Sequence, residues 1–365
     1  MIPPLLRRAG LVLTAALVTV LTVAAPAAAH GADAPDGTDY RTEVTGLTPA
    51  RPGLTVRAVE AGARLELVNT GGRDVEVIGY SGEPYLKVGP GGAYENTRSP
   101  ATYLNRTLAG DTTLPAEADP AAPPQWRRIA DEPRVRWHDQ RALWRESGVP
   151  APVAADPTRE HRVRDWAVPV RDGGEPVEIR GTLDWVPPPD PYPWWVAAAL
   201  GALALGAAGL LPAGSAAGTQ ALRAVGALLT LGGAAAVVLV VGRELDAGAD
   251  GLGGLLLGLL GGQVWALLTA LGAIAAGGYA LARRPAADFA LALAGTCLAI
   301  FVGVTNLSML SRAVAPVPWP GQYARLLLVL VLAAGAGALA AGVLRLHAAS
   351  RAALAASAGR TPVPA

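Results

Sequence analysis

Five long apolar runs between Trp194 and Leu344 constrain this chain more than any other feature of its sequence. Each run holds about 18–23 residues, mostly Ala, Leu, Gly and Val, and one helix of that length crosses a hydrocarbon layer ~30 Å thick. The runs predict membrane-spanning helices at about 194–211, 222–241, 262–282, 287–307 and 323–344. Because a soluble domain has no need of five such runs in succession, we expect a transmembrane helical domain over residues 191–345.

The short polar segments between the runs predict how the chain is oriented. Arg283 and Arg284 follow the third run and Arg345 follows the fifth, and basic residues in short loops favour the cytoplasmic side. We therefore expect a multi-pass protein of the cell membrane, with its N-terminal domain outside and a cytoplasmic tail at 346–365. The apolar stretch 251–261 is too short to span a bilayer alone, and it either lies at the interface or extends the third helix.

The composition of the runs bears on assembly and transport. Small Gly and Ala side chains let helices approach closely, so a compact bundle or a homo-oligomer within the lipid bilayer is expected. The few ionisable residues, such as Asp288 and Arg325, lie near the ends of runs. Since charges in mid-membrane usually mark transport paths, their positions argue against an ion pump.

The start of the chain has the pattern of a signal peptide, predicted for residues 1–29. Arg7 and Arg8 precede an apolar stretch, and three alanines at 27–29 provide the small residues that a signal peptidase requires. Cleavage after Ala29 would make His30 the first residue of the mature protein. An N-terminal His offers both its α-amine and an imidazole nitrogen to one metal ion, and nitrogen ligands of this kind suit Cu(II).

Residues 30–190 form the predicted extracytoplasmic domain. Short alternating stretches separated by turn residues predict β-strands, notably at 54–59, 64–68, 74–80, 85–88 and 166–185. The segment 109–125 is rich in Ala, Pro, Asp and Thr and is expected to be a loop or linker. The pattern predicts a mixed fold, in which an immunoglobulin-like β-sandwich precedes the transmembrane α-helical bundle.

Composition excludes several classes of function. The net charge of +1 gives no reason to expect nucleic-acid binding. A single cysteine, Cys297, leaves no disulfide within the chain and no cysteine-based metal site. The sequence also lacks the motifs of serine hydrolases, zinc proteases and phosphate-binding loops, so we favour a protein without catalytic activity.

Three of the four histidines fall in the exported part and define a candidate metal site. His138 is followed directly by Asp139, and a carboxylate can orient an imidazole as a ligand. We therefore predict a copper site made from His30 with His138, His161 or Asp139, provided that the fold brings them together. The alternative is that these histidines have only structural or surface roles.

Three stretches carry a resemblance to known proteins. The segments GYSGEPYLKVGPGGAYENTRSPATYLN, RWHDQRALW and GTLDWVPPPDPYPWW resemble a group of actinobacterial membrane proteins that join a signal peptide, a strand-rich exported domain and a helical bundle. His30 and the β-rich domain are also partly similar to copper-resistance proteins of the CopC type. That likeness implies envelope copper binding, but the sequence has no second copper histidine in a late glycine-rich strand.

These observations support one main function and two alternatives. The main prediction is a membrane-anchored protein that binds copper in envelope metal homeostasis. The first alternative is an interaction or assembly protein that binds an envelope partner without a metal. In that case Tyr85, Tyr94, Arg98 and Tyr103 would present the binding edge. The second alternative is a copper-dependent oxidase that uses the same N-terminal chelate.

Overall fold

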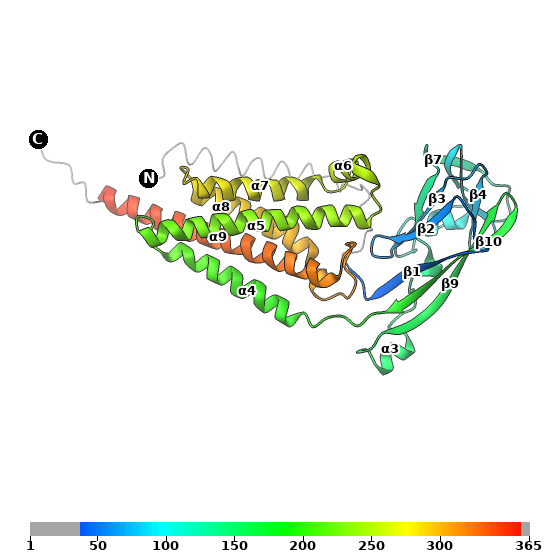
Figure 1. Ribbon diagram of the computed structural model, residues 1–365, viewed down its shortest axis with the longest axis horizontal. Helices are drawn as coiled ribbons and strands as arrows, with labels where there is room; N and C mark the ends of the chain where they lie inside the picture. The colour runs from blue at the N-terminus through cyan, green and yellow to red at the C-terminus, as the bar shows by residue number, and fades with distance from the viewer. Residues whose placement is uncertain (1–36, 359–365) are drawn as a thin grey trace, which may run out of the picture. The chain divides into compact units, whose positions relative to one another are not determined.

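The computed structural model describes residues 37–358. The predicted signal peptide 1–29 and His30 lie outside these residues. The described strands and helices belong to one unit of the chain. Strands occupy the part that precedes residue 186, and long helices occupy most of the part that follows (Figure 1).

The larger of two sheets has seven strands, and every neighbouring pair in it is antiparallel. In spatial order the strands are β1 (Tyr40–Thr48), β10 (Glu175–Trp185), β9 (His161–Asp172), β4 (Val75–Ile78), β5 (Pro84–Gly89), β6 (Gly92–Asn96) and β7 (Trp126–Ala130). The hairpin β9–β10, which lies largely within the stretch 166–185 predicted as strand, pairs with β1 and β4 from the first half of the domain. β1, β6, β7 and β8 were not among the strands predicted from the sequence.

The smaller sheet has three antiparallel strands, in the order β2 (Leu54–Val59), β3 (Arg64–Asn69) and β8 (Arg134–Trp137). β2 and β3, which correspond to the strands predicted at 54–59 and 64–68, form a hairpin whose turn contains Ala61 and Gly62. Glu60 and Ala61 both adopt positive φ angles there, of 56° and 53°. Residues other than glycine rarely adopt this left-handed backbone conformation. The contacts around the turn must therefore hold it in place.

The two sheets share one hydrophobic core. One cluster of buried side chains contains residues from both sheets. The smaller sheet contributes Leu65 and Leu67 of β3 and Val135 and Trp137 of β8. Along β9 the residues Trp166, Val168 and Val170 are buried and alternate with exposed ones, as the period of two requires. Each fully buried side chain of this size contributes about 1.5–3 kcal/mol. The coarse prediction of a β-rich domain is confirmed.

Short helices occupy the connections of this domain. They are α2 (Pro100–Leu104), the 3₁₀ turn η1 (Gln140–Ala142) and α3 (Ala151–Ala155). The Ser99 side chain caps α2 by accepting from the Ala101 N–H. Between α2 and β7 the chain forms only turns and bends, which agrees with the loop predicted at 109–125.

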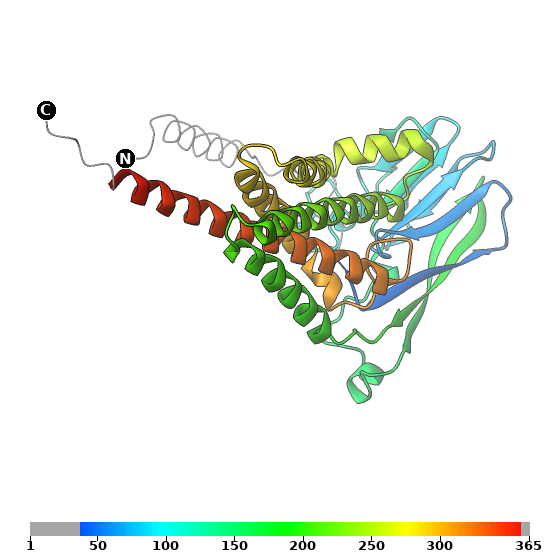
Figure 2. The ribbon, with the colours of Figure 1, turned by 60° about the vertical axis from the view of Figure 1, so that its left-hand side comes forward.

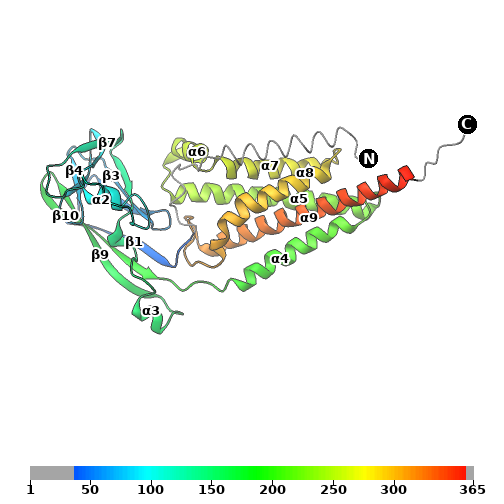
Figure 3. The same ribbon diagram turned by 180° about the vertical axis from the view of Figure 1, so that it is seen from behind.

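Five helices are long and apolar enough to cross a membrane. They cover 192–210, 216–246, 264–281, 287–310 and 321–357, and Figure 3 shows them running beside one another. The corresponding elements are α4 (Tyr192–Ala207) with η2 (Ala208–Leu210), α5 (Ala216–Asp246), α7 (Val264–Leu281), α8 (Ala287–Leu298) with the π-helical turn η3 (Ala299–Gly303) and the 3₁₀ helix η4 (Val304–Leu310), and α9 (Gly321–Ala358). Five candidate membrane-spanning helices therefore occur where five were predicted.

The stretch 251–261 forms a separate helix, α6 (Gly251–Gly261), which ends before α7 begins at Val264 (Figure 2). Its leucines 252, 256, 257 and 260 are exposed, while Leu259 is buried. α6 is therefore not a continuation of the third span.

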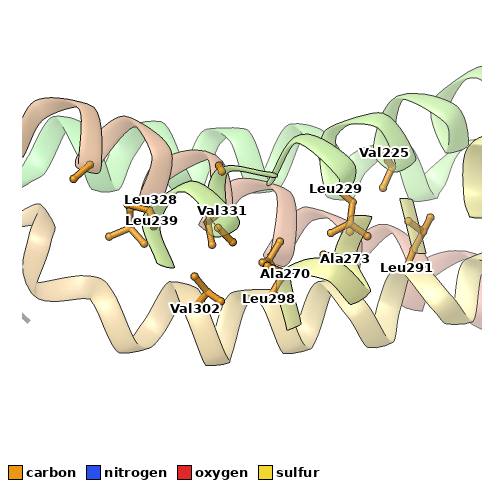
Figure 4. Close-up of a cluster of buried hydrophobic side chains, with 14 of the residues drawn as sticks. Val225, Leu229, Leu239, Ala270, Ala273, Leu291, Leu298, Val302, Leu328 and Val331 are labelled. Atoms are coloured by element: carbon orange, nitrogen blue, oxygen red, sulfur yellow. The ribbon is translucent and has the colours of Figure 1, made fainter. Parts of the chain in front are cut away.

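The helices pack around a core of small and branched residues, including Leu229, Leu239, Leu298 and Val331 (Figure 4). Glycines bring two backbones together here. A Cβ on Gly226 of α5 would lie 2.9 Å from the carbonyl oxygen of Gly277 in α7. In a bilayer the lipid tails are as apolar as the side chains, so helices associate through close packing of this kind and not through hydrophobic burial.

Candidate functional site

His138 directly follows β8 and is 1% exposed. Its Nδ1 lies 2.8 Å from the carbonyl oxygen of Ala63, and its Nε2 lies 3.2 Å from Nε of Arg64. Because a carbonyl can only accept, Nδ1 carries the proton and Nε2 accepts from the guanidinium. A metal at Nε2 would have to displace Arg64, so this histidine is better suited to holding the β2–β3 hairpin.

Asp139 is buried and its carboxylate is fully engaged. Oδ2 accepts from Nε1 of Trp137 at 2.9 Å and from Nη2 of Arg141 at 2.8 Å. Oδ1 accepts from the backbone N–H and Nε of Arg141, at 3.1 and 2.8 Å. These bonds also cap η1. The arrangement satisfies the acceptor positions of a carboxylate and gives Asp139 a structural role.

His161 begins β9 in a half-buried position with one ring nitrogen engaged. Nε2 lies 2.6 Å from the backbone oxygen of Asp156, so Nε2 donates and the neutral ring keeps its lone pair on Nδ1. Metal-binding histidines commonly donate their second nitrogen in this way. His161 is thus the predicted ligand whose geometry suits a metal best.

The four predicted metal ligands do not form one described cluster. His30 lies outside the described residues, so a site that includes it stays a prediction. Among residues 37–358, no group of three or more His, Cys, Asp and Glu side chains is arranged to hold a metal ion.

A buried polar network beside Asp139 was not predicted from the sequence. The Tyr80 hydroxyl donates to Oδ1 of Asn105 at 2.5 Å and accepts from the backbone N–H of Gln140 at 3.0 Å. Burial, followed by the charge of Asp139, raises the pKa of the Tyr80 hydroxyl, which therefore stays protonated. Nearby, the Ser99 hydroxyl donates to Oε1 of the buried Glu83 at 2.6 Å. Since its members come from distant segments, only the fold reveals this network.

A row of polar side chains crosses the outward face of the seven-stranded sheet. Directly paired residues point to the same face, and register places Lys87 of β5 between Glu76 of β4 and Tyr94 of β6. The row continues to Arg171 of β9 and Arg128 of β7. We call these five residues the outer row.

The residues suggested as a partner-binding edge are only partly on this face. Tyr94 belongs to the outer row, but Tyr85 is 4% exposed and packs in the core. The expectation that Tyr85 faces a partner is therefore wrong, because a bulge between Val77 and Ile78 shifts the register of β4 against β5. Tyr103 packs under the Arg106 guanidinium, and Arg98 donates to the Glu117 carbonyl.

The smaller sheet has a matching row, which contacts the helical part. Register aligns Arg57, Glu66 and Arg136 across its outward face. Arg57 and Arg136 each bond Glu66 and also donate to the carbonyl oxygen of Gly248, at 3.1 and 2.7 Å. Gly248 lies in the connection between α5 and α6. We call Arg57, Glu66, Arg136 and Gly248 the docking row.

Further contacts strengthen this junction. Asp250 pairs with Arg134 and Arg57. The hydrogen bond from Arg134 lowers the pKa of the Asp250 carboxyl, and the positive charges of Arg134 and Arg57 lower it further. Slight burial acts in the opposite direction but does not outweigh them. On the other side, Thr38 forms a β-bridge with Val314.

Asp39 adds a separate tie beside this bridge. Its carboxylate accepts from the Ala313 N–H at 3.0 Å and pairs with Arg312. The β-rich domain is therefore held to the helices at two separate places.

Together the fold and these contacts define a multi-pass membrane protein that carries a β-rich domain with two antiparallel sheets. Comparison with protein-family models, curated proteins and solved structures gives no significant match.

Proposed function

We propose that this chain is a cell-envelope protein that displays an immunoglobulin-like domain outside the membrane and binds an envelope partner through it, without catalysing a reaction. The observation that carries this proposal is the difference between the two outward faces of the domain. The docking row of the three-stranded sheet bonds to the connection between α5 and α6, whereas the bonds and ring contacts of Lys87, Tyr94 and Arg128 within residues 37–358 are made with other residues of the β-rich domain.

The chemistry of the outer row supports a binding role. Lys87, Arg128 and Arg171 supply positive charge, and Tyr94 supplies an amphipathic ring of the kind enriched at binding surfaces. A domain held at two places on the bundle keeps such a face in a fixed orientation. Fixed orientation lowers the entropic cost of binding a partner anchored in the same envelope.

Site-specific photocrosslinking in native membranes tests the proposal. Benzoylphenylalanine at position 94 or 128 should form the same defined adduct. The same residue at Arg180, an exposed position of β10 outside the outer row, is the matched control and should form none. If positions 94 and 128 form no adduct, or if all three form the same adduct, the outer row is not the binding face.

Copper binding is a second candidate, and the geometry of His161 favours it. The Nε2–H bond to Asp156 leaves Nδ1 as an oriented ligand, while the chelate predicted for His30 would supply the remaining nitrogens. Electron paramagnetic resonance of the purified mature chain with Cu(II) provides the test. Loss of the nitrogen-rich signal in His161→Ala, and in a chain with one extra residue before His30, would support the site. An unchanged signal in both would exclude it.

A further inference from the structure

Three turns meet at one end of the outer row and enclose an open groove of about 540 Å³. They contribute Gly72 and Arg73 before β4, Gly91 between β5 and β6, and Gly173 between β9 and β10. Lys87 and Tyr94 also line the groove.

The glycines keep this groove open. A Cβ on Gly91 would lie 3.3 Å from the Tyr94 hydroxyl, and one on Gly173 would lie 3.3 Å from Cδ and Nη1 of Arg73. Gly173 also has a φ angle of 59°, which disfavours other residues. Side chains at either turn would therefore crowd the two groups that a ligand would contact.

Lys87 is held in this groove by aromatic rings. Its Nζ lies 5.0 Å from the centre of the Tyr94 ring and 4.9 Å from the Trp126 ring. Within residues 37–358 it forms no ion pair and no hydrogen bond through Nζ, whereas most arginines of the domain pair with a carboxylate. The ammonium is thus positioned without its donors being used.

The choice of lysine here is specific to the position. The full sequence contains 30 basic residues, and Lys87 is the only lysine among them. A compact ammonium with three rotatable donors fits between two rings, where a planar guanidinium would stack against them. Arg73 adds a second, exposed cation, although its Nη2 also donates to Asp172 at 3.0 Å.

We propose that the groove binds an acidic sugar unit of an envelope glycan, with its carboxylate or phosphate on Lys87 and Arg73. The Tyr94 ring in the groove suits the apolar C–H face of a sugar ring, and the two cations suit one negative group. Asp74 also lines the groove and can accept from sugar hydroxyls. This inference rests on the proposed display function, because it names the ligand class of the outer row.

Calorimetric titration of the purified full chain tests the inference. The probes are trigalacturonate and glucose 6-phosphate as acidic sugars, cellotriose as a neutral sugar and inorganic phosphate as a bare anion. The acidic sugars should bind at least about tenfold more tightly than cellotriose and phosphate, a difference of about 1.4 kcal/mol. Equal binding of phosphate, or no binding of acidic sugars, would overturn the glycan assignment.

Variants locate the site. Lys87→Met and Arg73→Gln should each weaken acidic-sugar binding about tenfold or more, since each removes a charge-assisted hydrogen bond. Arg180→Gln removes the same charge outside the groove and should bind as the original chain does. Circular dichroism confirms that each variant is folded. Unchanged binding in Lys87→Met would overturn the proposal.

The outcomes also separate this inference from the display function. If acidic sugars do not bind but position 94 still gives a defined crosslink, then the ligand class is wrong and the display function stands. Conversely, acidic-sugar binding without any crosslink from position 94 would support the groove and argue against the wider outer row as a partner surface.

Discussion

The buried carboxylate of Glu66 accepts a hydrogen bond from Nε of Arg136 at 2.5 Å, and the same guanidinium donates to Gly248 at 2.7 Å. Glu66 is 1% exposed, whereas 30% of the Arg136 side chain remains accessible. One carboxylate thus orients the arginines that join the three-stranded sheet to the helices.

The first prediction concerns this carboxylate. Glu66→Gln removes the counter-charge of Arg57 and Arg136 and should lower the free energy of unfolding by about 1–3 kcal/mol. This loss of stability is smaller than that expected for a fully buried ion pair, because the guanidinium groups of Arg57 and Arg136 are partly solvated. Thermal unfolding of the purified chain measures it. Glu178→Gln, which breaks an exposed pair with Arg180, is the control and should change the midpoint little.

The second prediction is a pH dependence at Asp250. The pKa of its carboxyl is lowered in the folded protein, so its stabilising contribution is complete above its ordinary value near 4. That contribution is lost as the pH falls through the folded pKa. The difference in stability between the original chain and Asp250→Asn, about 1 kcal/mol or less at pH 7, should therefore vanish at the acid end of a pH series of unfolding curves. A difference that stays constant down to pH 2 would contradict this role.

The third prediction separates a structural Asp139 from a metal ligand. Asp139→Asn leaves Arg141 without its counter-charge and should destabilise the metal-free protein by about 2–4 kcal/mol. Asp165→Asn, which breaks an exposed pair with Arg162, is the matched control. If metal-free Asp139→Asn were as stable as the original chain, its bonds to Arg141 and Trp137 would not matter, and a ligand role would regain support.

The fourth prediction compares two adjacent glycines of α7. A Cβ on Gly277 would collide with Thr230 and with the backbone of Gly226, while one on Gly278 would have no heavy atom within 4 Å. Gly277→Val should therefore destabilise the bundle by about 1–3 kcal/mol, whereas Gly278→Val should be tolerated. Thermal unfolding in detergent distinguishes them, and equal effects would mean that α5 and α7 do not pack through these glycines.

Much of the architecture could be predicted from local pattern. Apolar length alone identified the five spans, and the alternation of Trp166, Val168 and Val170 identified β9. The local sequence pattern did not predict β8, because the charged residues Arg134 and Arg136 mask its strand pattern. The outward face of this strand is covered by the α5–α6 connection. The sequence pattern left open whether 251–261 is separate from the third span, since Gly261 and Gly262 continue an apolar run.

The candidate sites were harder to predict, because they depend on register and tertiary contact. His138 and Asp139 were predicted as metal ligands because they are neighbours in sequence. In the fold their side chains bond to Arg64 and Arg141 instead. In the sequence, Lys87 is distinguished only as the single lysine. Its position between Tyr94 and Trp126 follows from the pairing of β5, β6 and β7, which a sequence pattern does not specify.

The proposed display function requires the outer row to face the outside of the cell, and labelling of the single lysine measures this directly. A membrane-impermeant amine-reactive ester is applied to intact cells, and the modified peptides are identified by mass spectrometry. We expect Lys87 to be labelled, and a lysine introduced by Arg283→Lys at the predicted cytoplasmic end of α7 to stay unlabelled until the cells are broken. Labelling at position 283 but not at Lys87 in intact cells would contradict the account.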